Sequence, residues 1–175
     1  MTEPMTTSIT EPATDKKKSS GNRRLSRELA LKGLYQYFLS GNSEKNIYGH
    51  LTEDPLFPRA DQKYCSGLLH GTLENLDGLH LKISQFIDRK VEELSPVEHA
   101  VLCIAAYELA FDPSIPYRVV INEGIELAKR YGGVDGHKYV NGVLDHMAAD
   151  LRSKEFKPKP AIGNAKKSSA KAMAG

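Results

Sequence analysis

Hydrophobic side chains recur every three or four residues through most of the chain, the spacing that places them on one face of an α-helix. No segment of useful length alternates apolar and polar positions, so the pattern predicts no β-strand. The predicted helices cover residues 23–42, 59–76, 75–88, 95–112, 115–131 and 136–151, with a shorter and weaker one within residues 43–58. The sequence therefore indicates an all-α protein.

Residues 95–112 carry the clearest helix signals. Ser95 is a favourable N-cap, Pro96 fits the first helical position, and Glu98 stands where a capping-box partner is expected. The positions that follow are almost all apolar, so we expect this helix to be deeply buried.

A short turn separates the last two predicted helices. The pair Gly132-Gly133 is expected to end the first of them, because glycine enters the left-handed region without a Cβ clash. Asp135 is a favourable N-cap for the second. Tyr139 then lies at the edge of the apolar stripe, beside Lys138 and near the helix N-terminus, where an aromatic ring can face a ligand.

The first predicted helix, residues 23–42, begins with three cations and ends at Gly41-Asn42. We expect the side chains of Arg23, Arg24 and Arg27 to project past the packed body. Cations at a helix N-terminus oppose the helix dipole, at a cost of a few tenths of a kcal/mol each. A local rule broken in this way indicates a functional site.

Composition divides the chain into one folded domain, residues 22–151, and two tails. Residues 1–21 and 152–175 are polar and rich in lysine, so both are expected to be disordered. Charge follows the same division: residues 1–27 carry six basic and three acidic side chains, and residues 152–175 carry seven and one. Residues 28–151 carry 11 basic and 18 acidic side chains, which makes the body acidic. Basic ends suit phosphates and an acidic body suits a basic protein, although solvated tails explain the ends equally well.

No run of about 18 apolar residues is present, and the N-terminus lacks the apolar region of a secretory signal. We therefore expect a cytoplasmic protein without a membrane segment. Cys65 and Cys103 lie within apolar helical patterns and are interpreted as buried, reduced thiols.

Enzyme signatures are missing: the sequence holds no glycine-rich phosphate loop, no nucleophile elbow and no HExxH motif. The six histidines do not stand near cysteines at the spacing of a zinc site, so neither a metal nor a cofactor is expected. Glu92, Glu93 and Glu98 are better explained by a solvated acidic face, or a docking face for a cationic protein, than by acid–base catalysis.

The remaining candidates are typical of RNA binding. Arginines pair with phosphates, tyrosine rings stack on unpaired bases, and amides at a helix N-terminus bind anions. Periodicity alone leaves RNA binding and a plain helical body with basic ends equally open. The residues concerned are Arg23, Arg24, Arg27, Tyr35, Asp135, Lys138 and Tyr139.

Three segments carry a resemblance to a known family. They read RRLSRELALKGLYQ from residue 23, SPVEHAVLCIAAYEL from residue 95, and IPYRVVINEGIELAKRYGGVDGHKYVNGVLD from residue 115. The chain resembles the NusB family of bacterial transcription antitermination factors over residues 23–151. The resemblance implies about seven helices packed as two small bundles. It also implies binding to the single-stranded boxA element of ribosomal RNA leader transcripts.

Partners and site residues follow from the same resemblance. It implies a heterodimer with the ribosomal protein NusE, within a complex that includes NusA, NusG and RNA polymerase and that tethers the RNA to the elongating enzyme. It places boxA on the seven candidate RNA-binding residues named above. It places NusE around Glu92, Glu98 and Tyr107. Relatives occur as monomers or dimers, so a homodimer stays open, as does a structural, protein-docking role without RNA specificity.

Three positions depart from the family's usual residues. Tyr139 stands where phenylalanine is common, which keeps a ring for stacking. Leu25 stands where many relatives have a third consecutive arginine, so one phosphate contact fewer is expected. Cys103 stands where arginine is common.

Overall fold

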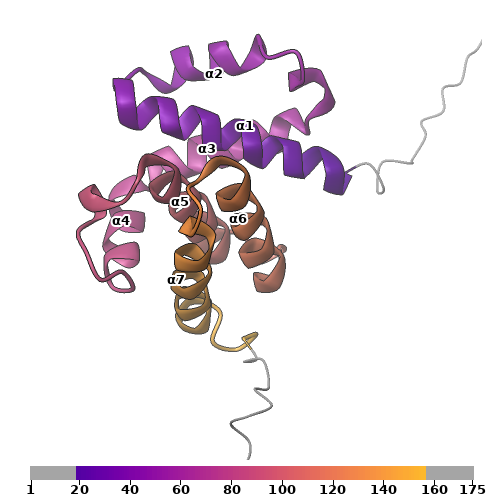
Figure 1. Ribbon diagram of the computed structural model, residues 1–175. Coiled ribbons are helices and arrows are strands. Elements are labelled where there is room, and N and C mark those ends of the chain that lie inside the picture. The colour runs from indigo at the N-terminus through magenta and orange to yellow at the C-terminus, as the bar shows by residue number, and fades with distance from the viewer. Residues whose placement is uncertain (1–18, 157–175) are drawn as a thin grey trace, which may run out of the picture.

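The computed structural model describes residues 19–156, and the regular secondary structure within them is all helical (Figure 1). The all-α prediction is thus confirmed. The α-helices are α1 (Ser19–Ser40), α2 (Glu44–Thr52), α3 (Gln62–Glu74), α4 (Leu76–Ser84), α5 (Pro96–Phe111), α6 (Tyr117–Tyr131) and α7 (Gly136–Leu151). Two short 3-10 helices, η1 (Phe57–Arg59) and η2 (Val91–Glu93), lie in the connections.

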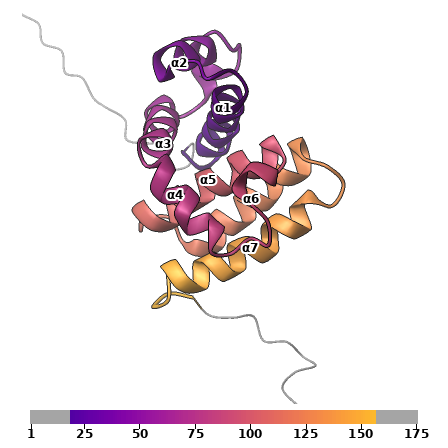
Figure 2. The ribbon, with the colours of Figure 1, turned by 90° about the vertical axis from the view of Figure 1, so that its left-hand side faces the viewer.

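The helices form two groups that share α5. Helices α1, α2 and α3 lie together on one side, and α4, α6 and α7 lie on the other (Figures 1 and 2). Helix α5 packs against α1, α3, α4, α6 and α7. Residues 100–106 of α5 are each at most 2% exposed, which confirms the predicted deep burial. A nearly all-apolar helix is stable only when neighbours cover every face, and here five helices do so.

Helix ends follow local chemistry in most places. The Ser95 hydroxyl accepts a hydrogen bond from the Glu98 amide at 3.2 Å, as an N-cap should. Gly41 ends α1 with φ of 68°. Gly132 ends α6 for a different reason from the one expected: its φ is −97°, and a Cβ there would lie 2.7 Å from the Ala128 carbonyl oxygen. Asp135 occupies the N-cap position of α7, but its side chain makes no capping hydrogen bond.

The folded body extends beyond the expected boundaries at both ends. Helix α1 begins at Ser19, and the chain packs as far as Phe156, whose ring lies 5.1 Å from that of Tyr117. Arg152 is 9% exposed and donates to the carbonyl oxygens of Leu109 at 2.8 Å and Asp112 at 2.9 Å. The segment that begins at Arg152 has the composition of a tail, but the guanidinium of Arg152 donates hydrogen bonds to carbonyl groups at the end of α5 that have no partner within the helix. The disorder expected for the rest of both tails falls on residues outside the described range.

Two further expectations concern cysteines and membranes. Cys65 and Cys103 are both free and buried, as predicted. No helix of residues 19–156 combines the length and the apolar character that crossing a bilayer requires.

Candidate nucleic-acid interface

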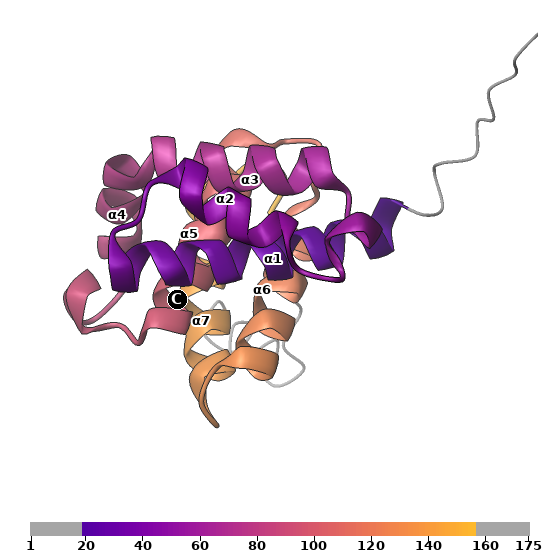
Figure 3. The same ribbon diagram turned by 90° about the horizontal axis from the view of Figure 1, so that it is seen from above.

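Helix α1 lies between α3 and the α6–α7 turn, which flank it on opposite sides (Figure 3). Successive side chains of a helix are rotated by about 100°, so neighbouring residues of α1 face different partners. This rotation separates the three arginines that the sequence presents as one patch.

Arg24 lies on the side of α6. Its guanidinium donates two hydrogen bonds to Glu123, at 3.0 and 2.8 Å, and its side chain remains 60% exposed. The hydrogen bonds to Glu123, followed by the charge of that carboxylate, raise the pKa of Arg24. One turn further along α1, Glu28 accepts hydrogen bonds from Arg130 and Tyr131 at the end of α6. The edge of α1 and the end of α6 therefore form one charged surface.

Arg27 is only 4% exposed, so the expectation that it projects past the body is wrong. It donates to the buried carboxylate of Glu108 on α5 at 2.9 and 3.0 Å and to the Tyr64 hydroxyl at 3.2 Å. Tyr64 in turn donates a short hydrogen bond to Glu108. Burial opposes the charge of Arg27, but the hydrogen bonds and charge of Glu108 leave its pKa raised. Arg27 holds α1 to α5 and offers no free guanidinium to a ligand.

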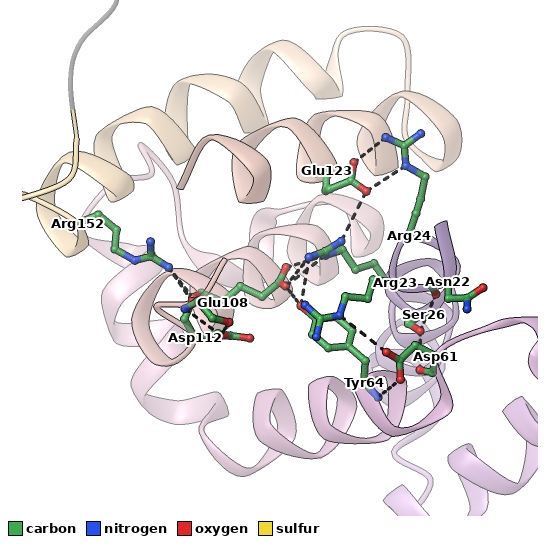
Figure 4. A network of polar contacts seen from close by, with 12 residues as sticks. Asn22, Arg23, Arg24, Ser26, Asp61, Tyr64, Glu108, Asp112, Glu123 and Arg152 are labelled. Atoms are coloured by element: carbon green, nitrogen blue, oxygen red, sulfur yellow. Dashed lines mark hydrogen bonds and ion pairs between the residues drawn. The ribbon is translucent and has the colours of Figure 1, made fainter. Parts of the chain in front are cut away.

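Arg23 points to the opposite side of α1, toward α3. Its guanidinium lies over the Tyr64 ring, 4.5 Å from the centroid, and 3.8 Å from the Asp61 carboxylate (Figure 4). Its side chain is 39% exposed. The structure thus places Arg23 and Arg24 on different flanks of the same helix end.

Tyr139, in the first turns of α7, contacts the loop between α4 and η2. Its hydroxyl donates to Asp88 at 3.2 Å, and the guanidinium of Arg89 lies 4.4 Å above its ring. Partial burial, more than any other cause, raises the pKa of Tyr139. The sequence pattern places Asp88 at the end of the predicted helix 75–88, but α4 ends at Ser84, so Asp88 and Arg89 lie in a loop and neither is a sequence-predicted candidate. The guanidinium of Arg89 therefore covers one face of the Tyr139 ring.

The remaining candidates are Asp135, Lys138 and Tyr35. Asp135 and Lys138 are highly exposed and pair with each other at 3.5 Å. Tyr35 is 40% exposed and stands eleven residues, or three helical turns, after Arg24, so both share one face of α1. The surface thus runs from Arg24 along α1 and over the α6–α7 turn to Tyr139; we call it the turn face.

Comparison with known proteins identifies the family. The model of the NusB family matches residues 24–149. Transcription antitermination protein NusB of Methylobacillus flagellatus is 55% identical over 148 residues, covering 83% of this chain and 96% of that protein. The chain belongs to the NusB family. The same protein of Nitrosomonas eutropha is 49% identical over 150 residues, covering 86% of this chain and 90% of the relative.

Solved structures agree with the fold. The structure of T. maritima NusB is 35% identical, with a TM-score of 0.65 over 78% of this chain and 93% of that one. A crystal structure of the antitermination factors NusB and NusE in complex with dsRNA contains a chain that is 23% identical, with a TM-score of 0.68 over 73% of this chain and 96% of that one. The second likeness supports the fold alone.

The three residues expected on the NusE side of this NusB-family protein do not form one cluster. Glu92 in η2 is exposed, and Glu98 at the start of α5 lies beside Gly136, where a Cβ would be 3.4 Å from its carboxylate. Tyr107 lies nine residues further along α5, about 14 Å away along the axis. It stacks on Phe111 at 5.2 Å, on the flank that also holds Arg23.

One expectation about metal ligands needs correction. The histidines were expected to lie apart from cysteines, but His80, His99 and Cys103 come together where α4 meets α5. The spacing of His99 and Cys103, one helical turn, is visible in the sequence. The third member, His80, reaches them only through the packing of α4 on α5, which the sequence pattern does not specify.

Proposed function

We propose that this protein binds the single-stranded boxA element of ribosomal RNA leader transcripts together with NusE, and thereby holds the transcript close to elongating RNA polymerase, in a complex with NusA and NusG. Membership of the NusB family supports this proposal. The observation that carries the RNA-binding part is the turn face, where exposed cations and partly exposed tyrosine rings follow one another across α1 and α7.

Arg24 is the proposed phosphate ligand at one end of the turn face. Its side chain is 60% exposed, whereas that of Glu123 is only 12% exposed and also lies 3.7 Å from Arg27, so the carboxylate keeps a cation when Arg24 turns to a ligand. A phosphate can therefore replace the carboxylate at small cost, and the forked guanidinium keeps two hydrogen bonds in either state. In the absence of RNA, Glu123 holds the guanidinium of Arg24 in a fixed orientation.

Tyr139 is the proposed stacking platform at the other end. Its ring already carries the flat cation of Arg89, 4.4 Å above the centroid, and a base has the same flat shape. A base can displace Arg89 from the ring or extend the stack above it. Tyr35 offers a second exposed ring on α1, and the exposed side chains of Asp135 and Lys138 at the start of α7 offer further polar contacts.

Arg23 and Arg27 have other roles in the proposal. Arg23 can reach a strand that continues past the end of α1 toward α3. Arg27 is a positioning residue, since its ion pair with Glu108 holds the helix end that presents Arg24.

The proposed NusE surface is the acidic region of Glu92 and Glu98, next to the turn face. The body that carries them has more acidic than basic side chains, which suits a basic ribosomal protein. We leave Tyr107 out of this surface, because a partner contacting it and Glu98 would have to span two flanks of the molecule. Because the proposed NusE surface is adjacent to the turn face, binding of either partner raises the effective concentration of the other.

The test is a fluorescence-anisotropy titration of a labelled boxA RNA, a scrambled strand and a boxA duplex, each with and without NusE. The proposal expects the single-stranded boxA RNA to bind best and NusE to strengthen that binding. The duplex is included because a relative of the same fold has been crystallised with NusE and dsRNA. Equal binding of all three RNAs would contradict the proposal, and NusE binding without any RNA binding would favour a protein-docking domain.

A further inference from the structure

Three metal-ligating side chains meet at the contact between α4 and α5. His99 and Cys103 stand one turn apart on the same face of α5, and His80 approaches them from α4. The Nε2 atoms of the two imidazoles are 2.7 Å apart, and the ligand atoms of all three residues lie within 4.8 Å of one another. None of the three belongs to the turn face or to the acidic NusE surface.

The surroundings shield this cluster without sealing it. Phe38 of α1 stacks on the His99 ring at 3.8 Å, nearly parallel, and Cys103 is fully buried. His80 and His99 keep partial exposure, which leaves a path for an ion from solvent. Burial lowers the pKa of both imidazoles, to about 4 for His99, so each ring is neutral near pH 7 and has a nitrogen lone pair to offer.

The dimensions suit a tetrahedral zinc ion. Zinc binds histidine nitrogen at about 2.0–2.1 Å and cysteine sulfur at about 2.3 Å, which sets neighbouring ligand atoms roughly 3.3–3.6 Å apart. The two imidazole nitrogens, 2.7 Å apart, are closer than this ideal, and the ligand atoms of all three residues lie within 4.8 Å of one another. Small rotations of the two imidazoles and of the thiol therefore reach the required geometry. Two nitrogens and one sulfur are ligands that Zn²⁺ favours.

We propose that His80, His99 and Cys103 bind a Zn²⁺ ion that joins α4 to α5. A water molecule from the partly exposed side of His80 completes four-coordination. Binding exchanges the Cys103 S–H bond for a Zn–S bond, with the proton released to solvent. The imidazole that donates in the His80–His99 hydrogen bond moves its proton from Nε2 to Nδ1, so both Nε2 atoms face the metal. The negative charges of Asp77 and Glu92 act on His80, and they would also favour a bound cation there.

The experiment uses the full, untagged chain, reduced with a phosphine and titrated with Co²⁺ as a spectroscopic substitute for Zn²⁺. The proposal expects a thiolate-to-cobalt charge-transfer band that saturates at one equivalent and disappears when Zn²⁺ is added. Zn²⁺ should also raise the melting temperature of the wild-type protein, because a ligand that binds only the folded state stabilises it.

Variants identify the ligands. His80→Gln, at a partly exposed position, should weaken Co²⁺ binding by more than about tenfold, a loss seen even when a group that only orients a ligand is removed. Cys103→Ala should abolish the charge-transfer band. The matched controls Cys65→Ala and His146→Gln, which remove the other buried thiol and an exposed histidine, should leave the band unchanged. A wild-type protein without the band, or a band that survives both His80→Gln and Cys103→Ala, would overturn the site and leave a hydrogen-bonded imidazole pair.

Discussion

Arg23, Arg24 and Arg27 leave the second and third turns of α1 in three directions and meet three environments. Arg24 is exposed beside an acidic partner, Arg23 lies over an aromatic ring, and Arg27 is enclosed with a buried carboxylate. One residue type therefore occupies an exposed position, a position over a ring and a buried position within five residues. Each position makes a different prediction for substitution.

Replacing Arg27 should destabilise the fold. Arg27→Met leaves the carboxylate of Glu108 buried without its cation, and breaking a buried pair in this way costs about 3–5 kcal/mol. The double variant Arg27→Met with Glu108→Leu should recover part of the loss, because it removes the unpaired charge. Urea unfolding followed by circular dichroism measures both. A double variant no more stable than the single one would contradict this account of the pair.

Replacing Arg24 should affect RNA and spare the fold. Arg24→Gln removes a mostly exposed guanidinium, and Glu123 keeps Arg27 3.7 Å away, so the free energy of unfolding should change by only about 1 kcal/mol. RNA affinity should fall, and the slope of log affinity against log salt should decrease by about one, as expected for one lost phosphate contact. An unchanged salt slope would remove Arg24 from the phosphate contacts.

Tyr139 should contribute through its ring. Tyr139→Ala should weaken RNA binding by about 1–3 kcal/mol, the usual contribution of one stacked base, with the salt slope unchanged. Tyr139→Phe loses only the hydroxyl that donates to Asp88 and should bind RNA like the wild type. If Tyr139→Phe binds as poorly as Tyr139→Ala, the hydroxyl rather than the ring is the important group.

The sequence pattern predicts the helices better than any other feature of the structure. Apolar spacing located all seven, and Ser95 and Gly41 marked ends that the structure confirms. The pattern does not predict contacts between side chains that are far apart in the sequence. Arg27 lies on the apolar face of α1, but its partner Glu108 is 81 residues away. Composition places Arg152 in a tail, and its role is not visible from the local sequence because the carbonyls it satisfies, around Leu109, are likewise distant in sequence.

The contact between α3 and α5 provides a matched test at this scale. A Cβ at Gly71 would lie 2.3 Å from the Tyr107 ring, whereas a Cβ at Gly67 would meet nothing within 4 Å. Gly71→Ala should therefore destabilise the protein by about 1–3 kcal/mol through overpacking. Gly67→Ala should stabilise it by up to about 1 kcal/mol, because alanine favours helix more than glycine does. Thermal unfolding of both variants measures the difference, and equal effects would mean that Tyr107 moves away freely.

At the scale of the whole molecule, the fold assembles its surfaces from segments far apart in the chain. The turn face combines α1, the end of α6, the start of α7 and the loop at Arg89, which α5 holds in place from within. The sequence supplied most of its residues as candidates, but only packing shows that Arg23 and Tyr107 lie on a different flank. The central claim is that RNA binds the turn face.

Amide chemical-shift mapping by NMR tests that claim most directly. Unlabelled boxA RNA is titrated into ¹⁵N-labelled protein, with a scrambled strand as the control. The account predicts that the largest shifts fall on the first turns of α1, the α6–α7 turn, the start of α7 and the loop at Asp88 and Arg89. Shifts concentrated on α2 and α3, with those segments unchanged, would contradict it.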